Sequence, residues 1–203
     1  MALLVMLVIG TLTVALVHAA PVAGQVDADT QAQIDNAMSA APSTISVAAK
    51  ILANELDNAS TFLVLQEGSN GWYCQPDEPG TPGPDPICFD QTWLDWMYAR
   101  VADKEPNVTV PEFAYMLQGG SESSNTDPDA TEKTEDVDWM TCPPHIMILL
   151  PGSLKETTGL SSDFDTAGPW IMYEDTPYEH IMMPVAEGMM DEMGDRAEAT
   201  PGT

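Results

Sequence analysis

Positive charge is the scarcest property of this chain. Only 6 of its 203 residues are Lys or Arg, against 32 Asp and Glu, and the formal net charge is −26. Because nucleic acids and anionic membrane surfaces repel such a protein, we expect neither as a partner. A solvated acidic surface explains this charge without any ligand. Binding of a cation is the alternative explanation.

The usual catalytic signatures are also missing. The sequence has no G-x-S-x-G, no H-E-x-x-H, no phosphate-binding glycine loop and no dinucleotide fingerprint. A nucleophile could come from Ser121–Ser124, beside Gly119-Gly120, with His145 or His180 as its base. Serines in a polar loop more often form turns. A small secreted hydrolase is therefore kept as the alternative to a binding function.

The N-terminus carries the longest apolar run, and this run is too short to span a membrane. Leu3 to Val17 is almost continuously apolar, and Val17-His18-Ala19 supplies the small residues of a cleavage site. This pattern predicts a signal peptide over residues 1–19, a secreted or periplasmic protein, and no membrane segment in the mature form. No Lys or Arg precedes the run, so either the α-amine alone supplies the positive end or translation starts further upstream.

Cysteine is rare, with three residues in the chain. Cys74 and Cys88 lie within Gly68–Asp90, a stretch so rich in proline and glycine that it forms neither a helix nor a central strand. In an oxidising compartment the two are expected to form a disulfide that closes this loop and contributes about 3 kcal/mol. Cys142 is left over, as a buried thiol, an intermolecular partner or a chance substitution.

Residues 20–185 are predicted to form a single α+β domain, followed by an acidic, Met-containing and disordered tail at 186–203. We expect a mainly antiparallel sheet of about six or seven short strands with one or two helices. The helices are predicted over Asp29–Ser39, capped by Asp29 or Thr30, and from an Asp90 N-cap to Pro106. The strands are predicted at 48–53, 61–66, 72–74, 112–118, 145–150, 170–173 and 178–185.

One turn and one loop are also predicted. Asn70-Gly71 favours a hairpin between the strands at 61–66 and 72–74. The stretch 119–136 has almost no apolar residues and is predicted to be a surface loop.

Two H-x-M triplets suggest a metal site. His145 and Met147 share one face of a predicted strand, and His180 and Met182 share one face of another. If these strands pair, two imidazoles and two thioethers could converge, and such ligands suit copper. Met is also a flexible filler of cores, and a lone His on a strand is often structural. Whether His145 and His180 meet depends on strand order, which the sequence does not reveal.

Calcium is the second candidate metal. Asp163, Asp165 and Glu174 match part of an EF-hand loop, although the flanking segments are not helical. Asn125, Asp127 and Asp129 could also bind a hard cation through oxygen atoms. In a chain this acidic, such spacings arise easily by chance.

Four segments of the chain, taken in order, carry a resemblance to known proteins: NGWYCQPDEPGTPGPDPIC, YMLQGGSESSNTDP, PPHIMI and TPYEHIMMPV. Together they resemble an uncharacterised family of exported bacterial proteins, over roughly Gly68 to Val185. The resemblance implies export and a bacterial source, with no assigned activity and no catalytic residue to carry over. Cys142 precedes PPHIMI where a small residue is expected, which argues against an essential thiol.

The sequence thus predicts an exported soluble protein of undetermined activity, with a metal- or ligand-binding role as the leading hypothesis. The expected ligand is a small molecule or a metal ion, copper or calcium. The oligomeric state stays open.

Overall fold

The computed structural model describes residues 26–130, 139–166 and 168–185. The predicted signal peptide and the predicted acidic tail lie outside these residues. Within the described ranges, no helix is long and apolar enough to cross a membrane.

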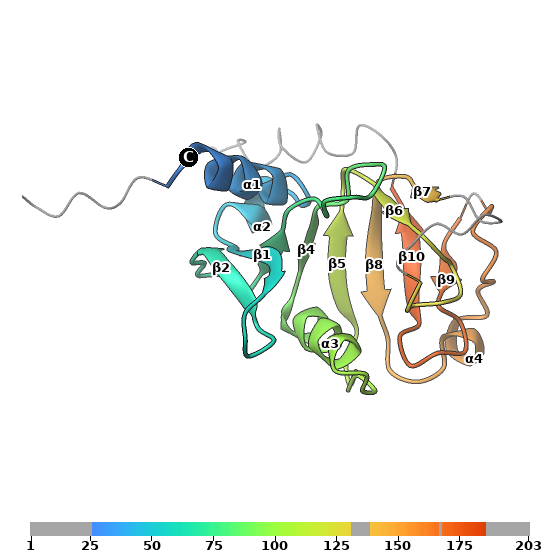
Figure 1. Cartoon of the computed structure of the whole chain (residues 1–203). Helices are drawn as coiled ribbons and strands as arrows, with labels where there is room; N and C mark the ends of the chain where they lie inside the picture. The colour runs from blue at the N-terminus through green and yellow to red at the C-terminus, as the bar shows by residue number, and fades with distance from the viewer. Residues whose placement is uncertain (1–25, 131–138, 167, 186–203) are drawn as a thin grey trace, which may run out of the picture.

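A mainly antiparallel sheet of eight strands forms the centre of the molecule, in the order β2-β1-β3-β4-β5-β8-β10-β9 (Figure 1). All neighbouring strands in it run antiparallel except β1 and β3. The strands are β1 (Lys50–Leu56), β2 (Phe62–Gln66), β3 (Tyr73–Gln75), β4 (Ile87–Phe89), β5 (Glu112–Met116), β8 (His145–Leu149), β9 (Trp170–Met172) and β10 (His180–Pro184). A separate ribbon pairs β6 (Gly120–Glu122) with β7 (Met140–Cys142).

The α+β class is confirmed, but the predicted counts of strands and helices are too low. The described residues form ten strands and four helices: α1 (Ala28–Met38), α2 (Ser43–Ser46), α3 (Gln91–Val101) and α4 (Leu154–Thr158). The missed strands β4, β6 and β7 have three residues each, and the missed helices have four or five. Elements this short show no hydrophobic periodicity, so no pattern reveals them.

The predicted hairpin between β2 and β3 is wrong. β2 pairs with β1, and β3 runs parallel to β1 on its other side. The Asn70 side chain donates to Ile45 O at 2.7 Å, so the Asn-Gly turn is anchored to the segment before β1. Between β2 and β3 the chain passes close to the start of β1 at Gly68. Only glycine fits there, because a Cβ at this position would lie 2.1 Å from Lys50 N.

Two longer helices cover opposite parts of the sheet. The predicted α1 is present, but its N-cap is Asp27, whose carboxylate accepts from the amides of Asp29 and Thr30. α3 begins after Asp90 as predicted and buries Trp93, Leu94 and Trp96. The predicted end at Pro106 is wrong, because α3 stops at Val101, whose side chain is 52% exposed.

The predicted Cys74–Cys88 disulfide is confirmed. The two cysteines are direct cross-strand partners in β3 and β4, and both are fully buried. The prediction that Gly68–Asp90 forms no central strand is therefore wrong, because β3 and β4 lie inside the eight-stranded sheet. The cysteines pack with Ile34, Ala37 and other residues in a core cluster of mostly small side chains under α1. A larger cluster, containing Trp93, Trp96 and several methionines, lies under α3.

Candidate functional site

A cavity of about 740 Å³ opens between α3, the sheet, the disulfide-closed loop and the β6–β7 ribbon. Its size is in the range that small-molecule sites occupy. We call it the α3 cavity. Its lining combines aromatic and thioether side chains with charged groups, and includes Phe62, Glu78, Asp85, Trp93, Trp96, Met97, Arg100, Met116, Ser121, Glu122, Asp129, Trp139, Met147, Tyr173 and His180.

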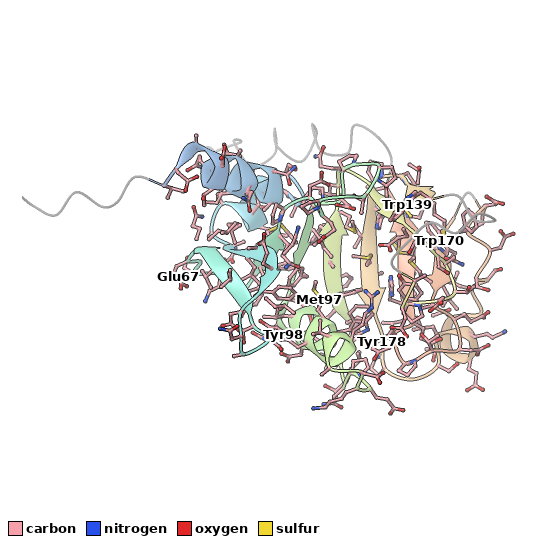
Figure 2. The ribbon with its side chains drawn as sticks, viewed as in Figure 1. Glu67, Met97, Tyr98, Trp139, Trp170 and Tyr178 are labelled. Carbon is pink, nitrogen blue, oxygen red and sulfur yellow. A yellow bond between two sulfur atoms is a disulfide. The ribbon has the colours of Figure 1, made fainter. Side chains whose placement is uncertain are left out.

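The Asp90 carboxylate positions the start of α3 by accepting two hydrogen bonds. Asp90 Oδ1 accepts from Trp93 N at 3.0 Å, and Asp90 Oδ2 accepts from Phe113 N at 2.9 Å. The first bond caps the helix, and the second ties its start to β5. Trp93 and Trp96 are thereby held against the sheet, and Figure 2 shows Tyr178 beside the same helix.

Tyr173 has a strained backbone at the cavity wall. Its φ is 58°, in the left-handed region that a bulky side chain rarely adopts. The conformation is fixed by a hydrogen bond from Tyr173 N to Asn125 O at 2.8 Å. Asn125 is itself held, because its side chain donates to Ser162 O and accepts from Trp170 Nε1. Strain of this kind clusters at functional sites, where neighbouring contacts maintain it.

The Tyr173 side chain meets three functional groups. Its hydroxyl donates to Glu122 Oε2 at 3.4 Å, and the guanidinium carbon of Arg100 lies 5.9 Å from its ring centre. The His180 ring packs edge-on to it, with 5.5 Å between the ring centres. Arg100 also donates to Pro128 O, which links α3 to the loop after β6.

Glu122 is the most perturbed carboxyl of the cavity. Loss of surrounding water raises its pKa to about 7, while Arg100 lowers the pKa, Asp85 raises it and the Tyr173 hydroxyl lowers it. Among the described residues, no Lys, Arg or His side chain forms an ion pair within 4 Å of the Glu122 carboxylate. The ionised carboxylate is therefore incompletely compensated near neutral pH.

A second acidic group lies in the disulfide-closed loop. Burial raises the pKa of Asp85 to about 6, and its side-chain contact with Asp77 adds to the shift. Burial, followed by Glu55 and Asp77, also raises the pKa of Glu78. These carboxyls repel one another, so a cation placed among them would be stabilised.

Two donors in the cavity wall lack acceptors. The indole nitrogens of Trp93 and Trp96 are buried, and neither finds a hydrogen-bond partner in the described part of the chain. Both rings stand edge-on to His180, with ring centres 5.4 Å and 5.8 Å away. Unpaired buried donors are uncommon, and here they are available to an acceptor atom of a ligand.

The two H-x-M strands do pair, side by side. Met147 lies directly opposite Met182, and His145 lies opposite Pro184. All four predicted ligands thus share the face of the sheet that α3 covers. Along β10, however, His180 lies four residues from Pro184, so the two imidazoles stand at opposite ends of the strand pair, with the two methionines between them.

Both histidines are neutral in this environment. Burial lowers the pKa of His145 to about 4 and that of His180 to about 4. His145 Nδ1 lies 2.7 Å from Pro143 O, and His180 Nδ1 lies 3.0 Å from Tyr178 O. A carbonyl oxygen only accepts, so each Nδ1 carries the proton and each Nε2 keeps its lone pair.

The serines of the predicted nucleophile loop serve mainly as structural groups. Ser124 Oγ accepts from the amides of Thr126 and Asp127, and Ser123 Oγ donates to Ala130 O. Ser121 is buried in β6, where a Cβ on Gly83 would lie 2.8 Å from its Oγ. No hydrogen bond joins these serines to His145 or His180 among the described contacts. The predicted surface loop is wrong over 120–125, because β6 pairs with β7 and the Asn125 side chain bonds to Ser162 and Trp170.

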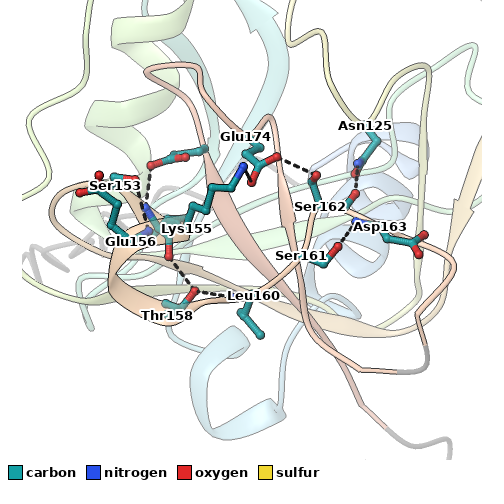
Figure 3. Close-up of polar contacts among 12 residues, drawn as sticks. Asn125, Ser153, Lys155, Glu156, Thr158, Leu160, Ser161, Ser162, Asp163 and Glu174 are labelled. Carbon is teal, nitrogen blue, oxygen red and sulfur yellow. Dashed lines mark hydrogen bonds and ion pairs between the residues drawn. The ribbon is translucent and has the colours of Figure 1, made fainter.

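The predicted calcium ligands have other partners, and Figure 3 shows those of Glu174. Glu174 Oε1 pairs with Lys155 Nζ at 3.1 Å, and its Oε2 accepts from Ser162 Oγ at 2.8 Å. Asp163 Oδ1 accepts from Asp165 N in a local turn. Within the described ranges, no three His, Cys, Asp or Glu side chains come together to hold a metal ion.

Cys142 is a buried thiol. It is 4% exposed, and burial raises its pKa to about 12, with Glu122 adding to the shift. A protonated, enclosed thiol is a poor nucleophile.

Sequence reasoning missed the central polar residues of the cavity, Arg100, Glu122 and Tyr173. Arg100 is one of few cations in the chain and lies beside an apolar helix face, which is a signal that could have been used. Glu122 carried no such signal, because it stands among many other acidic residues. Comparison of the chain with family models, with curated proteins and with solved structures finds no match.

Proposed function

We propose that this chain is an exported, non-enzymatic binding protein that takes a small organic cation into the α3 cavity. The observation that carries the proposal is Glu122, a carboxyl with raised pKa in an aromatic-lined cavity, with no ion-pair partner within 4 Å in the described chain. The Cys74–Cys88 disulfide and the predicted signal peptide support export.

The charge balance of the cavity favours a cation. Its lining contains four carboxyl side chains and one guanidinium, at Glu78, Asp85, Glu122, Asp129 and Arg100. A positively charged ligand would neutralise carboxyls that at present repel one another. The net charge of −26 also draws cations toward the protein from a distance.

The aromatic walls favour an organic cation over a hydrated metal ion. Phe62, Trp93, Trp96, Trp139 and Tyr173 all line the cavity. Aromatic faces attract quaternary and protonated amines by about 0.5–2 kcal/mol each. The unpaired indole N–H groups of Trp93 and Trp96 can also donate to an acceptor atom on the same ligand.

The test compares choline with its neutral isostere, in which carbon replaces the quaternary nitrogen, by titration calorimetry on the purified protein. We expect choline to bind and the isostere to bind at least about tenfold more weakly, a difference of about 1.4 kcal/mol. Choline affinity should fall as the pH decreases through about 7 and then through about 6, because Glu122 and then Asp85 become protonated.

Two variants localise the binding. Glu122→Gln removes the charge and is expected to weaken choline binding by about tenfold. Glu105→Gln removes an exposed carboxyl outside the lining and should have no effect. Equal binding of choline and its isostere, or equal effects of the two variants, would reject the proposal.

A further inference from the structure

His145 has an unused nitrogen that faces a methionine-rich part of the core. The residue is 1% exposed, and its Nε2 finds no hydrogen-bond partner in the described part of the chain. Because Nδ1 donates to Pro143 O, Nε2 carries the lone pair with which imidazole binds metals. An unpaired acceptor at this depth is disfavoured unless something occupies its lone pair.

Thioethers lie on the same face of the sheet. Met116 is the direct cross-strand partner of His145 in β5, and Met147 follows His145 by two residues along β8. Met182 is the partner of Met147 in β10. The strand registers therefore place three sulfur-bearing side chains beside the imidazole on the face under α3.

Gly120 shows how close two of these groups come. A Cβ added to Gly120 would lie 3.1 Å from Met116 Cε, 3.8 Å from Met116 Sδ and 3.5 Å from His145 Cε1. The Met116 thioether and the His145 ring thus both lie beside the space that a side chain at Gly120 would occupy. Met116 and Met147 also line the α3 cavity, which gives an ion a path to them.

The ligand chemistry selects the metal. No cluster of three His, Cys, Asp or Glu side chains exists among the described residues, so a zinc or calcium ion would lack its usual ligands. One neutral imidazole with thioethers is a soft set, and such sets bind Cu(I). We propose that His145 Nε2 and the sulfurs of Met116 and Met147 form a Cu(I) site at the inner end of the α3 cavity.

This site does not depend on the organic-cation proposal, because it uses different side chains. His180, predicted with His145 as a copper ligand, is not part of it, since the register places His180 at the other end of the strand pair. Met182 stands next to the site and is not required for a three-ligand ion.

The experiment is an anaerobic Cu(I) titration of the purified protein against a chromophoric copper chelator. We expect one equivalent of Cu(I) to bind, with no detectable binding of Zn(II) or Ca(II) under the same conditions. X-ray absorption of the Cu(I) protein should show one nitrogen and two sulfur neighbours. Failure to compete with the chelator, or a copper ion surrounded only by nitrogen and oxygen, would overturn the proposal.

Variants of similar volume separate ligation from packing. Met116→Leu keeps the core volume and removes a sulfur, and is expected to weaken Cu(I) binding by about tenfold or more. Met183→Leu changes the neighbouring methionine of β10 on the opposite face and should leave binding unchanged. Equal losses in both would overturn the proposal.

Gly120→Ala provides a second route that removes no ligand. The added methyl group fills the space beside Met116 and His145, and the flexible end of Met116 can move to accept it. We expect Cu(I) binding to weaken while the folded structure, followed by circular dichroism, is retained. Glu122→Gln should leave Cu(I) binding unchanged, so failure of the organic-cation proposal would be seen separately.

Discussion

The two faces of the sheet are packed in different ways. Under α1, small alanines and Ile34 and Ile51 surround the buried Cys74–Cys88 disulfide. Under α3, tryptophans and methionines surround a cavity. The described side chains have three buried polar atoms without a hydrogen-bond partner, and all three lie on this side, in Trp93, Trp96 and His145. The α1 face has the features of a stabilising core, whereas the α3 face keeps polar groups without protein partners, as a binding site does.

Removing the disulfide is expected to have the largest effect on the α1 face. In Cys74→Ser with Cys88→Ser, we expect the free energy of unfolding to fall by about 3 kcal/mol, because the unfolded chain gains the freedom of the open loop. Urea denaturation measures the change. Cys142→Ser, which breaks no disulfide, is the control. A smaller loss in the double variant than in the control would show that the α1 face does not depend on this bond.

Removing the N-caps of α3 and α1 in turn is expected to have effects of intermediate size on stability. Asp90→Ala removes two backbone contacts, the cap of α3 and the bond to Phe113, and should destabilise by about 2 kcal/mol. Asp27→Ala removes the exposed cap of α1 and should destabilise the protein less than Asp90→Ala does. Only Asp90→Ala is expected to weaken choline binding, because α3 carries Trp93 and Trp96. Equal effects on binding would contradict the assignment of the site to one face.

The last prediction concerns pH. The pKa of Glu122 is raised from 4.5 to about 7, so the folded state holds this proton more tightly than the unfolded state. Its contribution to stability is therefore fully present below pH 4.5 and is lost as the pH rises through 7. We expect the wild type to lose stability relative to Glu122→Gln over that interval, in urea denaturation without ligand.

The comparison with Glu122→Gln isolates one group. His145 and His180 have lowered pKa values, and their contributions are lost in the opposite direction, as the pH falls from 6.5 through about 4. Both histidines are present in both proteins, so their effects cancel in the difference. A difference that does not change with pH would contradict the raised pKa of the half-buried Glu122 carboxyl.

Local chemistry explains which elements the sequence predicted. Strong local patterns predicted the start of α3, with its Asp90 cap and the apolar residues of its first turns, and the strand His145–Leu149. Both form as expected. The β2–β3 hairpin was predicted wrongly because its Asn-Gly signal is overridden by tertiary contacts of Asn70 and Gly68. Strands of three residues, such as β6, depend on a partner strand for their definition and leave no pattern in the sequence.

The candidate site was predictable only in part. The histidines were identified because the chain has so few, and their shared face follows from the alternation of side chains along a strand. Met116 was not linked to His145, since that contact requires the register of β5 against β8. Glu122 could not be chosen from 32 acidic residues without knowing which carboxyl is half-buried in the cavity wall.

The acidic charge, the disulfide pair, the class of fold and the types of side chain available for binding could all be predicted from the sequence. These properties depend on composition or on residues close together in the chain. Three features required the folded structure: the position of His145 beside Met116, the contacts of Tyr173 with Glu122 and Arg100, and the cavity under α3. Such contacts join segments far apart in sequence, so they are fixed by strand order and register, which local patterns do not specify.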